Sequence, residues 1–191
     1  MSQQELSQVY WQIGQAVAQL HTIRFPHFGE VAANGVVLEQ GDYLNALTRR
    51  AEQRIARPHL VTLFLDVLNA HLDLFSDIQQ ATLCHEDLHK YNLLFYQEQG
   101  QWQLSTILDF DKAWAGHQES DLARLELWTG MTGEGFWPAY RAVSPVAAGY
   151  SQRRPIYQLF WCLEYAQSSP EHIADTQRVC QQLGIQPPEH F

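Results

Sequence analysis

The chain has 191 residues and a mass of 22.0 kDa, which is enough for one domain with a buried core. Hydrophobic residues make up 46% and charged residues 17% of the sequence, a balance that excludes disorder and collagen-like repeats. The 12 basic and 21 acidic residues give a net charge of −9. This balance argues against nucleic acid as a partner, because binding to the phosphate backbone requires clustered Lys and Arg.

The sequence also predicts a protein without membrane contact. No apolar run approaches the ~20 residues that a membrane helix needs, and the N-terminus does not have the pattern of a secretory signal. The three cysteines, Cys84, Cys162 and Cys180, show no metal-type spacing and are expected to be reduced. We therefore expect a cytoplasmic location.

The first third of the chain is predicted to be helical on both sides of a long loop. Ser2 and Glu5 have the spacing of a capping box, and apolar residues then recur every three or four positions as far as His21. Residues 22–41 predict a loop with one short strand at 36–38. The predicted helices that follow are 42–55, with Asp42 as N-cap, and 60–78, after Pro58.

The pattern changes in the middle of the chain. Short apolar runs on either side of a turn at 98–100 predict a small β-rich island, with strands at 81–84, 93–96 and 101–108. Further helices are predicted near 120–129, 135–143, 154–166 and 170–183. The predicted fold class is α+β, mainly helical with a small β-hairpin.

The polar residues that could carry out chemistry gather in the β-rich island. His85, Asp87 and Asn92 form a His-x-Asp-x-x-x-x-Asn pattern, and Asp109 follows at the end of a predicted strand. Phosphoryl transfer uses one carboxylate to accept the proton of a substrate hydroxyl, while an Asn and a second carboxylate hold magnesium against nucleotide phosphates. The spacing therefore predicts a phosphotransferase site.

Three segments resemble the aminoglycoside phosphotransferase and choline kinase superfamily, which has a protein-kinase-like fold. They are the catalytic-loop segment 85–92, the metal motif 109–111 with the strand before it, and residues 115–124. Residues 16–29 also resemble the beginning of that superfamily's C-terminal lobe. The resemblance implies that residues 1–191 form a single C-terminal lobe, in which 119–191 is a helical region on the acceptor side.

The resemblance implies a transfer of the γ-phosphate of ATP to a hydroxyl of a small molecule, which could be an aminoglycoside or another amino-alcohol. Asp87 would be the catalytic base. Asn92 and Asp109 would bind Mg²⁺ and, through it, the co-substrate ATP. His89 lies where protein kinases place a lysine that contacts phosphate, so it is a further candidate for nucleotide binding.

Other residues would support the loop or bind the acceptor. The resemblance implies that His85 and Asp121 support the catalytic loop. Glu126, Glu134 and Trp137 lie in the helical segment that would border the acceptor, where acidic and aromatic side chains would suit an amino-sugar.

The chain departs from the superfamily pattern in several places. Glu86 stands where a small residue, often glycine, is usual, and Asp111 stands where protein kinases have glycine. We find no glycine-rich loop, and no lysine precedes Lys90. We therefore expect that this chain lacks the N-terminal nucleotide-binding lobe. That lobe would be missing from the protein or supplied by a partner. Lys90 and Lys112 are expected to be surface charges.

Three other interpretations remain open. The segment from His85 to His89 also matches the His-Glu-x-x-His pattern of zinc hydrolases, with Glu119 as a third ligand, but that site requires both histidines on one helix. Asp109 and Asp111 could instead form the Asp-x-Asp of a sugar-nucleotide transferase. The third interpretation is a non-catalytic remnant of the kinase fold that acts by protein contacts.

Overall fold

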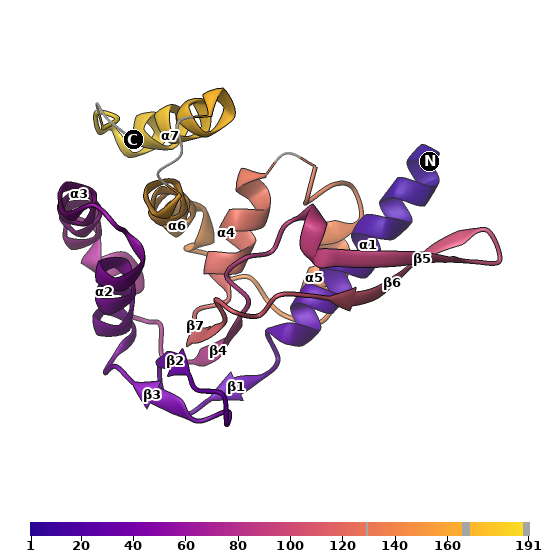
Figure 1. Cartoon of the computed structure of the whole chain (residues 1–191), viewed down its shortest axis with the longest axis horizontal. Helices are drawn as coiled ribbons and strands as arrows, with labels where there is room; N and C mark the ends of the chain where they lie inside the picture. The colour runs from indigo at the N-terminus through magenta and orange to yellow at the C-terminus, as the bar shows by residue number, and fades with distance from the viewer. Residues whose placement is uncertain (129, 166–168, 189–191) are drawn as a thin grey trace.

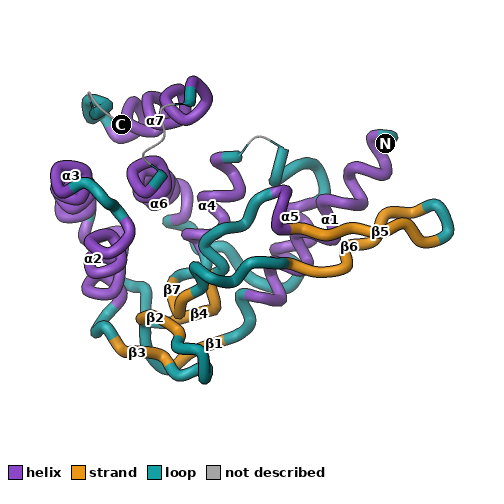
Figure 2. The backbone as a smooth tube through the Cα atoms, viewed as in Figure 1, coloured by secondary structure: helices purple, strands orange, loops and turns teal. Residues whose placement is uncertain are grey.

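The computed structural model describes residues 1–128, 130–165 and 169–188 and consists of two groups of strands flanked by helices (Figures 1 and 2). The helices are α1 (Gln3–Leu20), α2 (Tyr43–Arg54), α3 (Pro58–Asn69), α4 (Glu119–Leu127), α5 (Phe136–Arg141), α6 (Tyr150–Glu164) and α7 (Pro170–Leu183). The strands are β1 (Arg24–Phe25), β2 (Gly29–Val31), β3 (Val37–Glu39), β4 (Ala81–Cys84), β5 (Leu93–Glu98), β6 (Gln101–Ile107) and β7 (Trp114–Gly116). Short 3-10 turns occupy Leu72–Phe75 and Lys90–Asn92.

The first helix forms as the sequence predicts. The Ser2 side chain accepts a hydrogen bond from the Glu5 backbone N–H, and the Glu5 carboxylate accepts one from the Ser2 N–H, which completes the capping box. The helix packs closely against α5 at Gly14, where a Cβ atom would lie 2.4 Å from the backbone oxygen of Phe136. A glycine at this position therefore allows the two helices to approach.

The β structure is larger than the sequence predicts. Residues 22–41, expected to form a loop with one strand, contribute β1, β2 and β3 to a five-stranded antiparallel sheet of order β1-β4-β7-β2-β3. In its centre, Thr82 pairs with Gly116 and Cys84 with Trp114. Strands of two to four residues are too short to show an alternating pattern, and β1 and β7 pair with strands that are distant in sequence. The predicted fold class is thus correct in its helices but understates the sheet.

The predicted β-hairpin is confirmed. Strands β5 and β6 pair from Leu93↔Ile107 to Glu98↔Gln101, and the turn residues Gln99 and Gly100 both have positive φ, as a tight hairpin turn requires. The hairpin extends alongside α1 (Figure 1), where the Gln12 amide bonds the backbone of Trp102 and Leu104. This arrangement positions the strand ends that follow the catalytic-loop segment.

The remaining helices differ from prediction mainly at their ends. The predicted helix 60–78 stops at Asn69 and is followed by a 3-10 turn. Helix α6 begins at Tyr150, four residues before the predicted start. Pro155 therefore lies inside the helix and not in its first turn. The predicted ends at 129 and 166 lie outside the described residues. Helix α7 has its predicted bounds, with Ser169 as N-cap and Gly184 as C-cap.

A single hydrophobic core joins the helices to both groups of strands. Its large members include Trp114 of the sheet, Phe64 of α3, and Phe160 and Trp161 of α6. Cys84, Cys162 and Cys180 are buried and unpaired. Within the described ranges, none of the helices combines the length and the apolar character that crossing a bilayer requires.

Candidate functional site

The catalytic-loop segment 85–92 leaves the sheet at the end of β4 and is held by Asp121 at the N-terminal end of α4. The two Asp121 carboxylate oxygens accept the backbone N–H groups of His85 (2.7 Å) and Glu86 (2.8 Å). One of these oxygens also contacts His21 Nε2 at 3.1 Å, and His21 Nδ1 contacts the Tyr140 hydroxyl. Burial alone would raise the pKa of Asp121, but these contacts hold that pKa below its usual value.

His85 joins the loop to the segment that carries Asp109. Its Nδ1 accepts the backbone N–H of Asp87 at 3.1 Å, and its Nε2 donates to the backbone oxygen of Leu108 at 2.8 Å. The ring also packs against Phe110, with centroids 4.4 Å apart. Asp109 lies between these two contacted residues, so His85 fixes the loop relative to the metal motif 109–111. These are the contacts that a supporting role for His85 requires.

Asn92 makes a second connection between the same segments. Its Nδ2 donates to the backbone oxygen of Asp87 at 2.9 Å, and its backbone oxygen accepts the Leu108 N–H at 2.9 Å. Since the amide nitrogen is used within the loop, the Oδ1 atom is the one that can bind a cation. Asp109 is exposed and adopts a positive φ of 63°, a strained conformation that is common at functional sites.

The oxygen atoms of Asn92 and Asp109 fit a magnesium ion that also binds nucleotide phosphates. They do not form a site that holds a metal ion by protein side chains alone. Asn92 and Asp109 offer oxygen ligands from segments joined by a hydrogen bond, and Mg²⁺ is typically held by one or two protein oxygens together with substrate phosphates and water. Among the described residues, no group of three or more His, Cys, Asp or Glu side chains could hold a metal by itself. The fit therefore depends on a nucleotide that supplies the other ligands.

The carboxylate of Asp87 is surrounded by cations. Arg124 Nη2 lies 2.8 Å and the Tyr165 hydroxyl 3.1 Å from Oδ1, and Lys112 Nζ lies 3.3 Å from Oδ2. Burial favours the neutral acid, but Arg124 and Lys112 together hold the pKa of Asp87 below its usual value. The carboxylate is thus ionised at neutral pH and can accept a hydrogen bond from an approaching hydroxyl.

The residues around Asp87 differ from those that the sequence predicts. Lys112 is not a free surface charge, because its ammonium contacts both Asp87 and the Tyr165 hydroxyl (2.9 Å), whereas Lys90 is exposed as expected. Arg124 was not anticipated, although it lies three residues after Asp121 and therefore on the same helix face. Tyr165 comes from the end of α6, and nothing in the local sequence indicates its position.

His89 lies beside the same carboxylate. Its Nε2 is 3.9 Å from Asp87 Oδ1 and 3.4 Å from Asn92 Nδ2, while its Nδ1 accepts the Tyr91 backbone N–H. Burial, reinforced by Arg124, lowers the pKa of His89. The imidazole is therefore neutral at pH 7, and it lies close to both predicted site residues.

Glu86 occupies the position at which glycine is usual, and the structure explains the preference. It has a φ of 66°, which costs a non-glycine residue free energy. Its buried carboxylate receives hydrogen bonds from Arg50 Nε at 3.2 Å and from the Ser120 hydroxyl. Burial raises the pKa of Glu86 to about 7. The Arg50 guanidinium also binds Glu30 at 2.6 Å, so two carboxylates, Glu30 and Glu86, balance its positive charge.

Two of the predicted acceptor residues, Glu126 and Trp137, contact Tyr150. Glu126 accepts hydrogen bonds from Tyr150 (2.7 Å) and Arg154 (3.3 Å), and the Trp137 ring packs against Tyr150. Glu134 is exposed. None of the three predicted residues lines the cavity that borders the Asp87 contacts. That cavity of about 150 Å³ is lined by Arg124, Leu127, Trp128, Trp161, Tyr165, Ser169, Glu171, His172 and Asp175.

The geometry contradicts the zinc-hydrolase interpretation. Residues 85–89 form a loop and not a helix, and both nitrogens of His85 are used in hydrogen bonds to the backbone. Glu119, the proposed third ligand, instead binds the Arg153 guanidinium through both oxygens at 2.7 and 2.8 Å. These residues stabilise the lobe.

Replacing Asp121 by Asn should test how strongly this residue holds the loop. Asp121→Asn removes a buried charge and one of the acceptors for the backbone N–H groups, so we expect the free energy of unfolding to fall by about 2–4 kcal/mol at pH 7. Because the pKa of Asp121 is depressed in the folded state, its contribution exists above the unfolded pKa and is lost as the pH falls below about 4. Urea unfolding at pH 7 and pH 3 measures both effects.

The exposed Asp66 of α3 is the matched control, and Asp66→Asn should change stability by less than about 0.5 kcal/mol. Equal stability of Asp121→Asn and Asp66→Asn at pH 7 would show that the Asp121 contacts contribute nothing.

The fold and its loop define a member of the protein-kinase-like superfamily. The sequence pattern named Fructosamine kinase matches residues 42–185, so the chain belongs to the fructosamine kinase family. A candidate ketoamine kinase of Enterococcus faecium is 31% identical over 83 residues, which are 44% of this chain and 28% of that protein.

Solved structures show the same fold. A candidate fructosamine-3-kinase from Thermobifida fusca superposes with a TM-score of 0.62 at 22% identity, covering 93% of this chain and 64% of that one. Another from Haemophilus somnus gives 0.62 at 18% identity, covering 93% and 63%. The chain thus spans less than two thirds of the length of these relatives. The expected absence of an N-terminal lobe stays a prediction.

Proposed function

We propose that the protein is an ATP-dependent kinase that phosphorylates a hydroxyl of a ketoamine, a sugar that carries an amine substituent next to its carbonyl group. The family match includes Asp87, Asn92 and Asp109, the three groups that phosphoryl transfer requires. The predicted aminoglycoside or generic amino-alcohol acceptor gives way to a sugar amine, which the family favours. We propose that residues 1–191 form one catalytic lobe. We also propose that a glycine-rich loop outside these residues supplies further nucleotide contacts.

In this proposal each residue has a distinct task. Asp87 accepts a hydrogen bond from the acceptor hydroxyl, orients it, and takes its proton as the oxygen bonds to the γ-phosphorus and the bond from that phosphorus to ADP breaks. Arg124 and Lys112 keep that carboxylate ionised and fixed in position. Asn92 and Asp109 would hold Mg²⁺, which neutralises negative charge on the nucleotide phosphates.

The cavity lined by Arg124 and Tyr165, which both bond Asp87, is the proposed acceptor site, and unpaired donors are the observation that favours a polar ligand there. Arg124 Nε and Trp161 Nε1 are buried and lack a hydrogen-bond partner among the described residues, and both residues line this cavity. Buried donors are usually paired, and a rotation of either side chain toward the cavity would let its donor bond a sugar oxygen. Glu171 and Asp175 also line the cavity and would attract a protonated amine.

The test is a transfer assay on the protein expressed from its complete gene. We expect phosphate transfer from MgATP to a ketoamine made from glucose and a lysine side chain. Fructose, choline and an aminoglycoside, which lack the ketoamine group, serve as controls and should be phosphorylated at least about tenfold less efficiently. Transfer to the aminoglycoside alone would correct the acceptor, while a lack of transfer to every acceptor would favour the non-catalytic remnant.

A further inference from the structure

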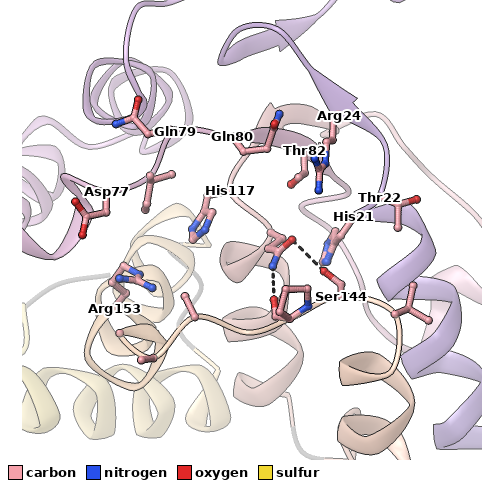
Figure 3. A pocket seen from close by; sticks show the side chains of 17 residues that line it. His21, Thr22, Arg24, Asp77, Gln79, Gln80, Thr82, His117, Ser144 and Arg153 are labelled. Carbon is pink, nitrogen blue, oxygen red and sulfur yellow. Dashed lines mark hydrogen bonds between the residues drawn. The ribbon is translucent and has the colours of Figure 1, made fainter.

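A second and larger cavity is lined by residues from β1, β4 and the loop before α6. Its volume is about 670 Å³, within the range of small-molecule sites, and Figure 3 shows the side chains that surround it. Among the described residues, it shares no lining residue with the cavity that Arg124 and Tyr165 line. It is lined by His21, Thr22, Arg24, Asp77, Ile78, Gln79, Gln80, Thr82, His117, Gln118, Val143, Ser144, Pro145, Ala147, Ala148, Gly149 and Arg153.

Two arginines line this cavity, in a protein with a net charge of −9. Arg24 is exposed on β1, next to Thr82 of β4. Arg153 is 8% exposed. Its guanidinium donates to Glu119 through Nε and Nη2 and to the Leu74 backbone oxygen through Nη1. Three of its five N–H groups are thereby used, which leaves two for a ligand.

His117 supplies a further donor between the two arginines. The Tyr43 hydroxyl donates to the Tyr157 hydroxyl at 3.0 Å, and that hydroxyl lies 2.9 Å from His117 Nδ1. Burial, reinforced by Arg153, lowers the pKa of His117 to about 3, so the ring is neutral. With Nδ1 accepting from Tyr157, the single proton is on Nε2, which can donate.

The remaining lining is suited to hydroxyl groups. The Gln118 amide bonds Ser144 and the Pro145 backbone oxygen and forms part of the wall. Asp77 is the only carboxylate in the lining among the residues that the structure describes. Figure 3 shows it near Arg153, with Gln79 above it and Arg24 at the opposite side. A ligand can therefore place an anionic group near one arginine and hydroxyl groups near Asp77 and Gln79.

From this arrangement we propose that the cavity is a binding site for a small hydroxylated anion with the chemistry of a sugar phosphate. Arg24 would bind the anionic group, while Arg153, the His117 Nε2–H, Asp77 and the glutamine amides would bind hydroxyls. The proposal does not depend on the kinase activity, because it involves neither Asp87 nor the metal motif 109–111.

Calorimetric titration of the whole protein tests this site with three probes: glucose 6-phosphate, inorganic phosphate and glucose. We expect one molecule of glucose 6-phosphate to bind per chain, more tightly than glucose. Arg24→Ser removes an exposed cation that is not part of the core, and it should weaken binding about tenfold. Ala148→Trp, on an exposed loop residue of the lining, should fill the cavity and abolish binding.

Two controls separate this site from others. Arg49→Ser removes an exposed arginine that does not line the cavity, and Asp87→Asn alters the candidate catalytic site, so both should bind glucose 6-phosphate like the unchanged protein. Equal binding by all variants, binding of glucose as tight as that of glucose 6-phosphate, or no binding of either phosphate probe at millimolar concentration would each overturn the proposal.

Discussion

Asp87→Asn is expected to lower turnover by about two to four orders of magnitude, since general-base contributions have that size. The amide keeps the shape of the side chain but cannot take the proton of the acceptor hydroxyl. Nucleotide affinity should change little, because Asn92 and Asp109 are untouched and the Asn92 side chain bonds the backbone of Asp87 rather than its carboxylate. Steady-state kinetics with MgATP and a ketoamine would measure both quantities.

The design needs a control for the cations around Asp87. Removing this carboxylate leaves Arg124 and Lys112 without their partner, so part of a lost activity could come from a displaced loop. Thermal unfolding of Asp87→Asn should therefore be compared with that of Asp66→Asn, whose side chain is exposed on α3. A folded Asp87→Asn protein with turnover near that of Asp66→Asn would exclude Asp87 as the base.

Asp109→Asn is expected to reduce both turnover and the affinity for MgATP. The substitution removes the one carboxylate charge of the proposed Asn92 and Asp109 pair, and a metal held by few protein ligands depends strongly on each of them. We expect the Mg²⁺ concentration that supports half-maximal activity to rise about ten- to a hundredfold. Titration of the activity with Mg²⁺ at fixed ATP gives this value directly.

This prediction separates the two carboxylates by their response to metal. High Mg²⁺ should partly restore Asp109→Asn but not Asp87→Asn, because only the former has lost a metal ligand. Asp73→Asn, an exposed carboxylate outside the site, should keep the Mg²⁺ dependence of the unchanged protein. If Asp109→Asn shows that same dependence, Asp109 does not bind the metal.

Local sequence was sufficient to predict the elements whose signals lie within a few residues. The capping box fixed the start of α1, and Ser169, Pro170 and Gly184 fixed both ends of α7. Gln99-Gly100 between two apolar runs indicated the hairpin. Each of these signals acts through backbone groups close in sequence, so no tertiary contact can easily override it.

Only the tertiary structure decided the sheet and the surroundings of the candidate base. Strands β1, β2 and β7 are two or three residues long and are stabilised by pairing with distant strands. The sequence indicated that Asp87, Asn92 and Asp109 belong together. It could not show that Arg124, Lys112 and Tyr165 converge on the same carboxylate, because these come from α4, from the loop before β7 and from the end of α6.

The acceptor side shows the same division. Glu126 and Trp137 have suitable chemistry, and in the structure both contact Tyr150. Arg124 lies only two positions before Glu126, and residues two apart on a helix face different directions. The sequence therefore shows the residue types that a phosphotransferase needs. Helix packing determines which of the neighbouring polar side chains surround the candidate base.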